Sequence, residues 1–232
     1  MSRAGPVHRV RALLFDMDGT LVNSIAVVER TWRRFAGRYG LDPAAVLAVC
    51  HGRRAGETVT LFASPGMDIE AEVERLTAEE IADVEGVVAI PGARELLAAL
   101  PRGRWAIVTS ASRTLATTRL AVAGLIVPDA LVTAEAVVDG KPAPDGYLAA
   151  ARALGVAAAE CLAFEDAPAG LQAARAAGAV VVAVAGAAVA GDRRLHESAP
   201  GGWIADFTGL EVVAQPDGSL LVAIAPPVAL HT

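Results

Sequence analysis

The chain has 232 residues, of which 54% are hydrophobic, and a net charge of −6 with an isoelectric point near 5.3. This balance supports a buried core and argues against nucleic acid or a membrane surface as a partner. Cys50 and Cys161 are too few for a disulfide framework, and the four histidines form no zinc pattern. We therefore expect a cytoplasmic protein, a monomer or weak homodimer, without a signal peptide or membrane-spanning segment.

The first predicted element is a buried strand over residues 10–15, where an apolar run stops at Asp16. Asp18 and Gly19 follow, at the kind of strand end beyond which open α/β sheets bind ligands. Two acids without a basic neighbour are costly to desolvate, which indicates a bound cation or acid–base chemistry. A turn that merely favours aspartate and glycine explains this stretch equally well.

Residues 23–89 are predicted to be all-helical. The predicted helices cover residues 24–39, 43–49, 56–63 and 69–84. Arg30, Arg34 and Arg38 recur every four residues in the first helix. We interpret them as a solvated face that pairs with the acidic helices that follow.

From residue 90 onward, strands and helices alternate, which predicts a parallel sheet covered on both faces. The predicted strands are 105–108, 130–132, 161–164 and 179–184, and the predicted helices are 93–100, 112–123, 144–154 and one that starts at Pro168. Pro216-Asp217-Gly218 signals a hairpin between residues 211–215 and 219–224, and the residues from Pro226 onward are predicted to be a loose tail.

The predicted fold is therefore α/β. Residues 1–22 and 90–232 are expected to form a Rossmann-like, doubly wound parallel sheet that ends in a C-terminal β-hairpin. An all-helical cap domain is expected to be inserted at residues 23–89, directly after the first strand.

Reactive side chains follow four successive strands of this sheet. They are Asp16 and Asp18, Thr109 and Ser110, Lys141, and Glu165 and Asp166. Because the strands are parallel, these ends meet at one edge of the sheet. Carboxylates from two strands form a hard oxygen site suited to Mg²⁺, and a lysine with a hydroxyl would complete a clamp on a phosphoryl group.

Lys141 is the one lysine among the 20 basic residues of the chain. A composition that otherwise uses arginine keeps a compact ammonium at this position, and the two groups are not interchangeable. The alternative interpretation is a chance survivor at a turn beside two prolines.

Four segments resemble the motifs of the haloacid dehalogenase-like hydrolase superfamily. Asp16-Met17-Asp18-Gly19-Thr20 is similar to its first motif, and Thr109-Ser110 stands at the place of its second. Gly140-Lys141-Pro142 resembles the third motif, and residues 164–170 resemble the fourth. Their order and spacing agree over nearly the whole chain, and the helical insert is similar to a type-one cap.

Within that superfamily, the chain is most similar to sugar-phosphate, polyol-phosphate and glycerol-phosphate phosphatases. The resemblance rests on Cys50-His51-Gly52-Arg53, on Ala167-Pro168-Ala169-Gly170 and on the terminal hairpin. It implies Mg²⁺-dependent hydrolysis of small phosphate monoesters, with sugar or polyol phosphates as the expected substrates, through an aspartyl-phosphate.

The resemblance also implies roles for single residues. Asp16 would attack phosphorus, and Asp18 would protonate the leaving alcohol and then deprotonate the attacking water. Lys141 would balance charge between the phosphate and Asp16. Thr109 and Ser110 would bind phosphoryl oxygens, with the register of the hydroxyl open between the two.

The resemblance implies a magnesium site as well. Mg²⁺ would be held by Asp16, the backbone carbonyl of Asp18 and Asp166, with Glu165 nearby or acting through water. Asn23 stands where many relatives have aspartate, which leaves the detail of the substrate open.

Related activities differ from this chain at single positions. Phosphonoacetaldehyde hydrolases of the superfamily need a cap lysine, which is missing here, and haloacid dehalogenases lack the equivalent of Asp18. β-Phosphoglucomutases carry a histidine in the cap where this chain has Val28. The alternatives that remain are phosphoryl transfer of the β-phosphoglucomutase type and a non-catalytic binding protein on the same fold.

The loop His51-Gly52-Arg53-Arg54 interrupts the cap helices. We expect it to face the core and to contact the leaving group, because glycine allows a close backbone approach and the flanking side chains can bind hydroxyls. A solvated turn between helices is the alternative. Gly86, Pro91 and Gly92 suit a hinge whose closure would exclude water from the site.

Overall fold

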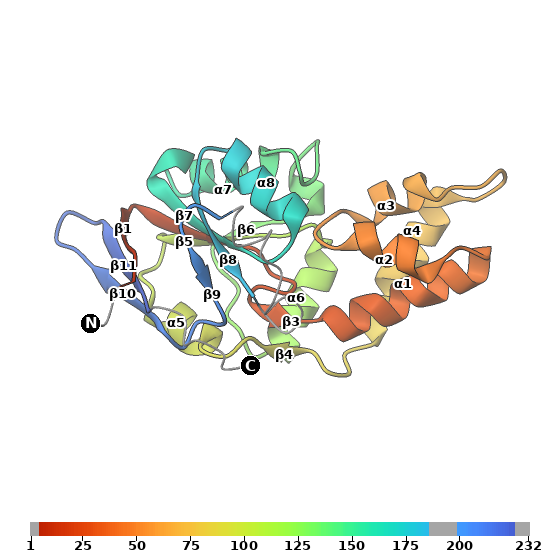
Figure 1. Cartoon of the computed structure of the whole chain (residues 1–232), viewed down its shortest axis with the longest axis horizontal. Helices are drawn as coiled ribbons and strands as arrows, with labels where there is room; N and C mark the ends of the chain where they lie inside the picture. The colour runs from red at the N-terminus through yellow and green to blue at the C-terminus, as the bar shows by residue number, and fades with distance from the viewer. Residues whose placement is uncertain (1–4, 186–198, 226–232) are drawn as a thin grey trace.

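A computed structural model describes residues 5–185 and 199–225 (Figure 1). Its centre is a six-stranded parallel sheet in the order β6-β5-β2-β7-β8-β9. The strands are β2 (Ala12–Phe15), β5 (Trp105–Val108), β6 (Ala130–Val132), β7 (Cys161–Glu165), β8 (Val180–Val184) and β9 (Trp203–Ile204). Phe15 is in register with Ile107 on one side and with Phe164 on the other. The strand order therefore reverses at β2, where ligands bind in doubly wound sheets.

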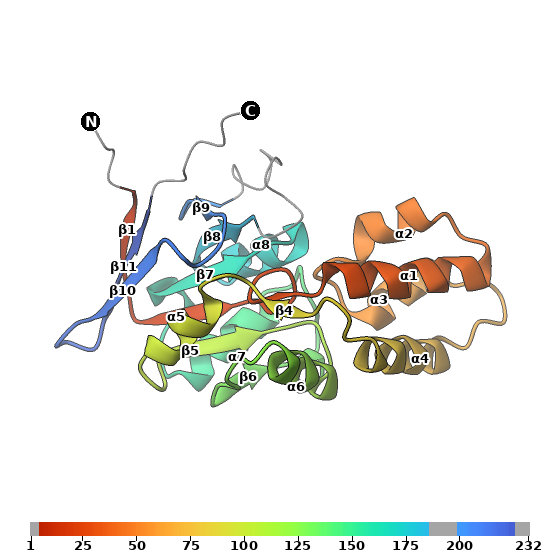
Figure 2. The ribbon, with the colours of Figure 1, turned by 90° about the horizontal axis from the view of Figure 1, so that it is seen from below.

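Helices cover both faces of this sheet (Figure 2). They are α5 (Ala93–Ala99) and α6 (Arg113–Val122) on one face, and α7 (Asp145–Ala153) and α8 (Pro168–Ala176) on the other, with 3-10 turns η1 (Ala134–Ala136) and η2 (Ala158–Glu160). Leu13 and Phe15 of β2 belong to the first core, and Ala12 and Leu14 to the second. Because a strand buried on both sides must be apolar throughout, this confirms the doubly wound α/β prediction.

A second, antiparallel sheet has the order β1-β11-β10. It contains β1 (Val7–Val10), β10 (Leu210–Ala214) and β11 (Leu220–Ile224), so the C-terminal hairpin is confirmed. The single strand predicted over residues 10–15 is wrong at its start. Val10 is the last residue of β1 and pairs with Leu220, and β2 begins at Ala12. Arg11 turns the chain: its N–H donates to the Glu160 carbonyl and its guanidinium to the Asp217 carbonyl, both at 2.7 Å.

The cap helices lie together at one end of the molecule (Figure 1). They are α1 (Ile25–Tyr39), α2 (Pro43–Cys50), α3 (Ala55–Leu61) and α4 (Ile69–Ala82). Trp32, Phe35 and Leu76 are among the buried residues of a separate core that these helices share. A core of their own accounts for the helical periodicity of the sequence in this segment.

The arginine face of α1 pairs with α4 and the residue after it, as predicted. Arg30 donates to Asp83 at 2.8 Å, and Arg34 lies 3.9 Å from Glu79. Arg38 donates to Glu79 at 2.8 Å and also contacts Glu72. These ion pairs join the first and last helices of the cap to each other.

Two short strands connect the cap to the core. Strand β3 (Val22–Asn23) pairs antiparallel with β4 (Val88–Ala89), so the two crossings of the chain lie side by side. Neither strand was predicted, because two residues carry no periodic signal. We keep residues 1–22 and 90–232 as the proposed core and 23–89 as the proposed cap, since both proposed boundaries lie at this pair.

Both cysteines are free and buried, so they are small residues of the packed interior. No helix in the described part of the chain is long and apolar enough to cross a membrane. The predicted loose tail from Pro226 onward lies outside the described residues.

Candidate active site

Asp16 stands at the end of β2, between the two neighbouring strands. Its backbone N–H donates to the Phe164 carbonyl at 3.0 Å, which continues the sheet pairing by one residue. Its side chain is buried, and Lys141 donates to its Oδ1 at 2.5 Å. The sheet therefore fixes the backbone of Asp16, and the lysine fixes one of its carboxylate oxygens.

The Lys141 ammonium is held by three strands at once. Besides Asp16, which directly follows β2, it donates to Glu165 of β7 at 2.5 Å and to the Val108 carbonyl of β5 at 3.2 Å. An ammonium has three N–H groups, and each has an acceptor here. Only 5% of the residue is exposed, and the adjacent carboxylates raise its pKa despite the opposing effect of burial. Lys141 is therefore a fixed positive charge at the edge of the sheet.

Glu165 is fully buried, and its two oxygens together accept four hydrogen bonds. Oε1 accepts from Lys141 and from the Tyr147 hydroxyl at 2.9 Å, and Oε2 accepts from the N–H groups of Asp166 and Ala167. Gly170 is needed beside it, since a Cβ there would lie 1.7 Å from Oε1. Glu165 therefore positions Lys141, and it also lies beside Asp16 and Asp166. Its predicted place near the metal, direct or through water, stays a proposal.

Three carboxylates meet at this edge of the sheet. Asp16, Glu165 and Asp166 each offer an oxygen within 4.8 Å of the others. Burial and repulsion by Glu165 raise the pKa of Asp16 to about 8. Burial and repulsion by Asp16 and Glu165 raise the pKa of Asp166 well above its usual value. One lysine does not compensate three acids, so a divalent cation bound by oxygen ligands fits this site.

Asp166 is held against the first motif. Its Oδ1 accepts a hydrogen bond from the Thr20 hydroxyl at 3.1 Å. Gly19 has a φ of +85°, and a Cβ on it would lie 1.9 Å from Asp166 Oδ2. The glycine of the first motif is therefore required both by its backbone conformation and by the approach of the carboxylate.

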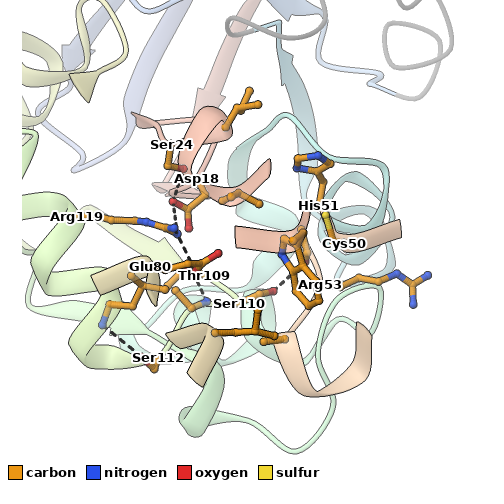
Figure 3. Close-up of a pocket in the computed structure, with 18 of the residues that line it drawn as sticks. Asp18, Ser24, Cys50, His51, Arg53, Glu80, Thr109, Ser110, Ser112 and Arg119 are labelled. Carbon is orange, nitrogen blue, oxygen red and sulfur yellow. Dashed lines mark hydrogen bonds and ion pairs between the residues drawn. The ribbon is translucent and has the colours of Figure 1, made fainter. Parts of the chain in front are cut away.

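Asp18 lies on the cavity side of β2, with two contacts to the same oxygen. Its Oδ1 accepts a hydrogen bond from Ser24 at 2.7 Å and an ion pair from Arg119 at 2.8 Å. Ser24 precedes α1 but does not cap it with its side chain, because the hydroxyl is used for Asp18. Figure 3 shows these groups converging on Asp18.

Thr109 and Ser110 follow β5 and have different partners. Thr109 Oγ1 accepts from the Ala111 N–H at 3.1 Å, and the Ser110 hydroxyl donates to the Gly52 carbonyl of the cap at 2.8 Å. Both residues line the cavity. Thr109 thus belongs to the core edge, whereas Ser110 contacts the cap.

A cavity of about 100 Å³ lies between the core edge and the cap (Figure 3). Most of the lining residues from the core are polar, and the cap contributes both apolar and polar ones. Its lining includes Asp16, Asp18, Thr109, Ser110, Arg119 and Asp166 from the core, and Val28, Trp32, His51, Gly52, Arg53, Leu76 and Glu80 from the cap.

Comparison with known proteins agrees with this arrangement. A family model described as haloacid dehalogenase-like hydrolase matches residues 10–178. The chain belongs to the haloacid dehalogenase-like hydrolases. It is 47% identical to hexitol phosphatase A of Escherichia coli strain K12 over 180 residues, which cover 76% of this chain and 83% of the relative.

Two further comparisons give the same family. Glycerol-1-phosphate phosphohydrolase 2 of Saccharomyces cerevisiae is 35% identical over 76% of this chain and 75% of its own. A crystal structure of a hydrolase from Pseudomonas syringae superposes with a TM-score of 0.68 at 28% identity, covering 82% of this chain and 90% of the other. The family fold is therefore shown by sequence and structure alike.

In this haloacid dehalogenase-like hydrolase, three residues of the predicted substrate loop line the cavity. His51, Gly52 and Arg53 face it, and burial lowers the pKa of the His51 imidazole. Arg54 does not line it. Its guanidinium donates to the carbonyls of Val137 and Val138 at 2.9 and 2.8 Å, so we revise its predicted role from substrate contact to a tie between the cap and the loop before Lys141.

We expect Gly52→Ala to lower kcat/KM by about 10-fold or more with all phosphate esters. Gly52 has a φ of +73°, and a Cβ there would lie 2.8 Å from the Ala167 Cβ of the core. The substitution strains the loop and keeps the cap from seating. Steady-state kinetics would show it, with Gly66→Ala as the control, because Gly66 also has a positive φ but nothing near its Cβ. Equal losses in both variants would contradict the close-approach explanation.

Three residues of the hydrolase site were not predicted from the sequence: Tyr147, Arg119 and Glu80. Tyr147 lies in the first turn of α7 and bonds Glu165, a contact that only the sheet order brings about. Arg119 and Glu80 lie on α6 and α4, where an arginine and a glutamate read as ordinary surface residues. For Arg119, the sequence pattern could have indicated burial, because the residue falls on the same helix face as Leu115, Ala116 and Leu120.

Proposed function

We propose that this protein is a Mg²⁺-dependent phosphatase that hydrolyses small phosphate monoesters of the sugar or polyol phosphate class through an aspartyl-phosphate. The observation that carries the proposal is the ammonium of Lys141, held 2.5 Å from both Asp16 and Glu165 beside Asp166. Fixed charges of this kind stabilise a phosphoryl group in transfer, whose chemistry depends mainly on positioning. The names of the relatives, a hexitol phosphatase and a glycerol-1-phosphate phosphohydrolase, support the substrate class.

In the proposed first step, Asp16 attacks phosphorus and the P–O bond to the alcohol breaks. Lys141 holds Asp16 Oδ1, so the other oxygen is presented for attack. Asp18 gives its proton to the leaving alcohol. Both of its contacts are to Oδ1, which leaves Oδ2 to carry that proton.

In the second step, water attacks the aspartyl-phosphate, and Asp18 takes a proton from it. The bond between Asp16 and phosphorus breaks, phosphate leaves, and both carboxylates return to their starting forms. Thr109 stands at the end of β5 beside Asp16, and we propose it as the hydroxyl that binds phosphoryl oxygens. Magnesium, when bound by Asp16, Asp166 and the backbone carbonyl of Asp18, supplies charge neutralisation at those oxygens.

The lining of the cavity supports hydrolysis over phosphoryl transfer of the β-phosphoglucomutase type. Val28, which stands where those enzymes carry a cap histidine, lines the cavity with an apolar side chain. All residues proposed for catalysis are present, which argues against a binding protein that has lost turnover.

A panel of phosphate esters tests the proposal. Purified protein is expected to release phosphate from hexitol, glycerol and sugar phosphates and from p-nitrophenyl phosphate with added Mg²⁺. Release should stop with EDTA and return when Mg²⁺ is restored. No release from any ester in Mg²⁺ would overturn the proposal.

We expect Arg53→Ala and His51→Ala to lower kcat/KM for the preferred sugar or polyol phosphate by about 10-fold or more. Both side chains line the cap half of the cavity, and neither is among the hydrogen-bond or ion-pair partners of Asp16 and Lys141 in the described part of the chain. p-Nitrophenyl phosphate should be nearly unaffected, because the core chemistry is untouched. Equal losses on both substrates would point to impaired closure instead, and no loss on either would assign substrate selection to other cap residues.

A further inference from the structure

An arginine is buried on the core side of the cavity without a role in the steps above. Arg119 lies on the inward face of α6, and only 2% of it is exposed. An arginine is almost never this buried unless its charge is paired, because desolvating it is costly. Its Nε and Nη2 have no hydrogen-bond partner among the described residues, so the charge of the guanidinium depends on ion pairs with neighbouring carboxylates.

The two ends of the guanidinium contact two different bodies of the molecule. Nη1 lies 2.8 Å from Oδ1 of Asp18, in the first motif of the core. Nη2 lies 3.2 Å from Oε2 of Glu80, on helix α4 of the cap, and α4 packs against α6. Figure 3 shows Arg119 between these two carboxylates. One side chain thus joins the proposed acid–base group to the cap.

The bridge between Arg119 and Glu80 is more enclosed than the Arg30–Asp83 pair at the end of α4. The side chains of Arg119 and Glu80 are 3% and 13% exposed, whereas Arg30 and Asp83 are 36% and 17% exposed. Burial raises the pKa of Glu80 to about 7, against the effect of Arg119. Enclosed pairs depend strongly on both partners, and this pair exists only while α4 rests on the core.

Asp18 is also held from the hinge. Ser24, which donates to the same Oδ1, directly follows β3 and directly precedes α1 of the cap. Both groups that fix Asp18 are therefore connected to the cap, Ser24 through the chain and Arg119 through Glu80. A residue that served only to attach the cap would have no need to contact Asp18.

We propose that Arg119 is a positioning residue that fixes the Asp18 carboxylate and ties it to the cap through Glu80. The inference rests on the proposed function, because it takes Asp18 as the acid–base group. Seating of the cap and placement of Asp18 are then one event, so the acid is in position only when the site is closed to water.

A series of aryl phosphates of similar size but different leaving-group acidity tests this role. A phenolate that leaves easily needs no proton, so a misplaced Asp18 should harm only the poorer leaving groups. We expect Arg119→Gln to lower kcat/KM by about 10-fold or more for phenyl phosphate and by less than about 3-fold for p-nitrophenyl phosphate. Arg119→Lys, which keeps the charge but reaches one partner, should recover part of the loss.

Glu80→Gln tests the cap end of the bridge with a matched control. It should shift the same substrate series in the same direction by about 3-fold or more, because Arg119 loses its charged partner. Glu79→Gln is the control: Glu79 precedes Glu80 on α4, and its partners Arg34 and Arg38 lie within the cap. It should leave the series unchanged.

Equal losses across the series would overturn the proposal, because a merely structural arginine affects all leaving groups alike. An unchanged series in Glu80→Gln would overturn the tie to the cap. Small-angle scattering of the free protein gives a readout that does not need activity. The radius of gyration should increase in Glu80→Gln and not in Glu79→Gln. If the wild-type protein hydrolysed no ester, the proposed function would fail, while the scattering would still show whether the bridge holds the cap.

Discussion

Asp16→Asn is expected to abolish phosphate release, with a loss of at least about 1000-fold in kcat. The amide is not a nucleophile toward phosphorus and does not bring the negative charge that a cation ligand needs. Asp16 is fixed by β7 through its backbone and by Lys141 through its side chain, so no other described carboxylate takes its place. Continuous assay of phosphate release with p-nitrophenyl phosphate measures the effect.

The control for Asp16→Asn is Asp129→Asn. Asp129 forms an exposed pair with Arg102 and does not line the cavity, so the same substitution there should leave turnover unchanged. Both variants should have a thermal unfolding midpoint close to that of the wild type. If Asp16→Asn kept a tenth of the wild-type rate, the covalent mechanism would be wrong.

Lys141→Arg is expected to lower kcat by at least about 100-fold although it preserves the charge. The three acceptors of the ammonium lie at 2.5, 2.5 and 3.2 Å and come from three different strands. A guanidinium is planar and wider, so it cannot direct its N–H groups to these three positions at once. The side chain has no room to withdraw, since it is 5% exposed and the Tyr147 ring centre lies 5.5 Å from Nζ.

Lys141→Met tests whether the loss in Lys141→Arg comes from a misplaced charge. Methionine fits the volume without charge, so a loss as large as that of the arginine variant means that placement of the charge, and not its mere presence, is required. Circular dichroism and thermal unfolding establish that both variants fold. Near-normal turnover in Lys141→Arg would mean that the single lysine is an accident of composition.

The strands and their reactive ends were predictable because they depend on local patterns. An apolar run that stops at a carboxylate marks the end of β2, and helical spacing with Gly40 marks α1. Parallel pairing then brings Asp16, Thr109 and Glu165 to one edge, whatever the detailed packing is. Lys141 was found from composition, since a single lysine in an arginine-rich chain is visible without a structure.

Some element boundaries failed for a physical reason. Val10 is separated from the apolar run of β2 only by Arg11, but its partner Leu220 lies near the other end of the chain, so β1 joins a different sheet. The linker strands β3 and β4 are stabilised by each other and not by their own sequences. Local propensity does not report either pairing.

The sequence by itself determined the chemistry: which carboxylates, hydroxyls and lysine stand at the strand ends, and that helices follow the first strand. Only the tertiary structure decided which partners these groups contact. The oxygens of Glu165 accept hydrogen bonds from Lys141, Tyr147 and the backbone, and Arg54 donates to the Val137 and Val138 carbonyls. Arg119 lies between Asp18 and Glu80. The reason is that each of these contacts joins residues far apart in sequence, where charge and burial are set by the partner and not by the neighbours along the chain.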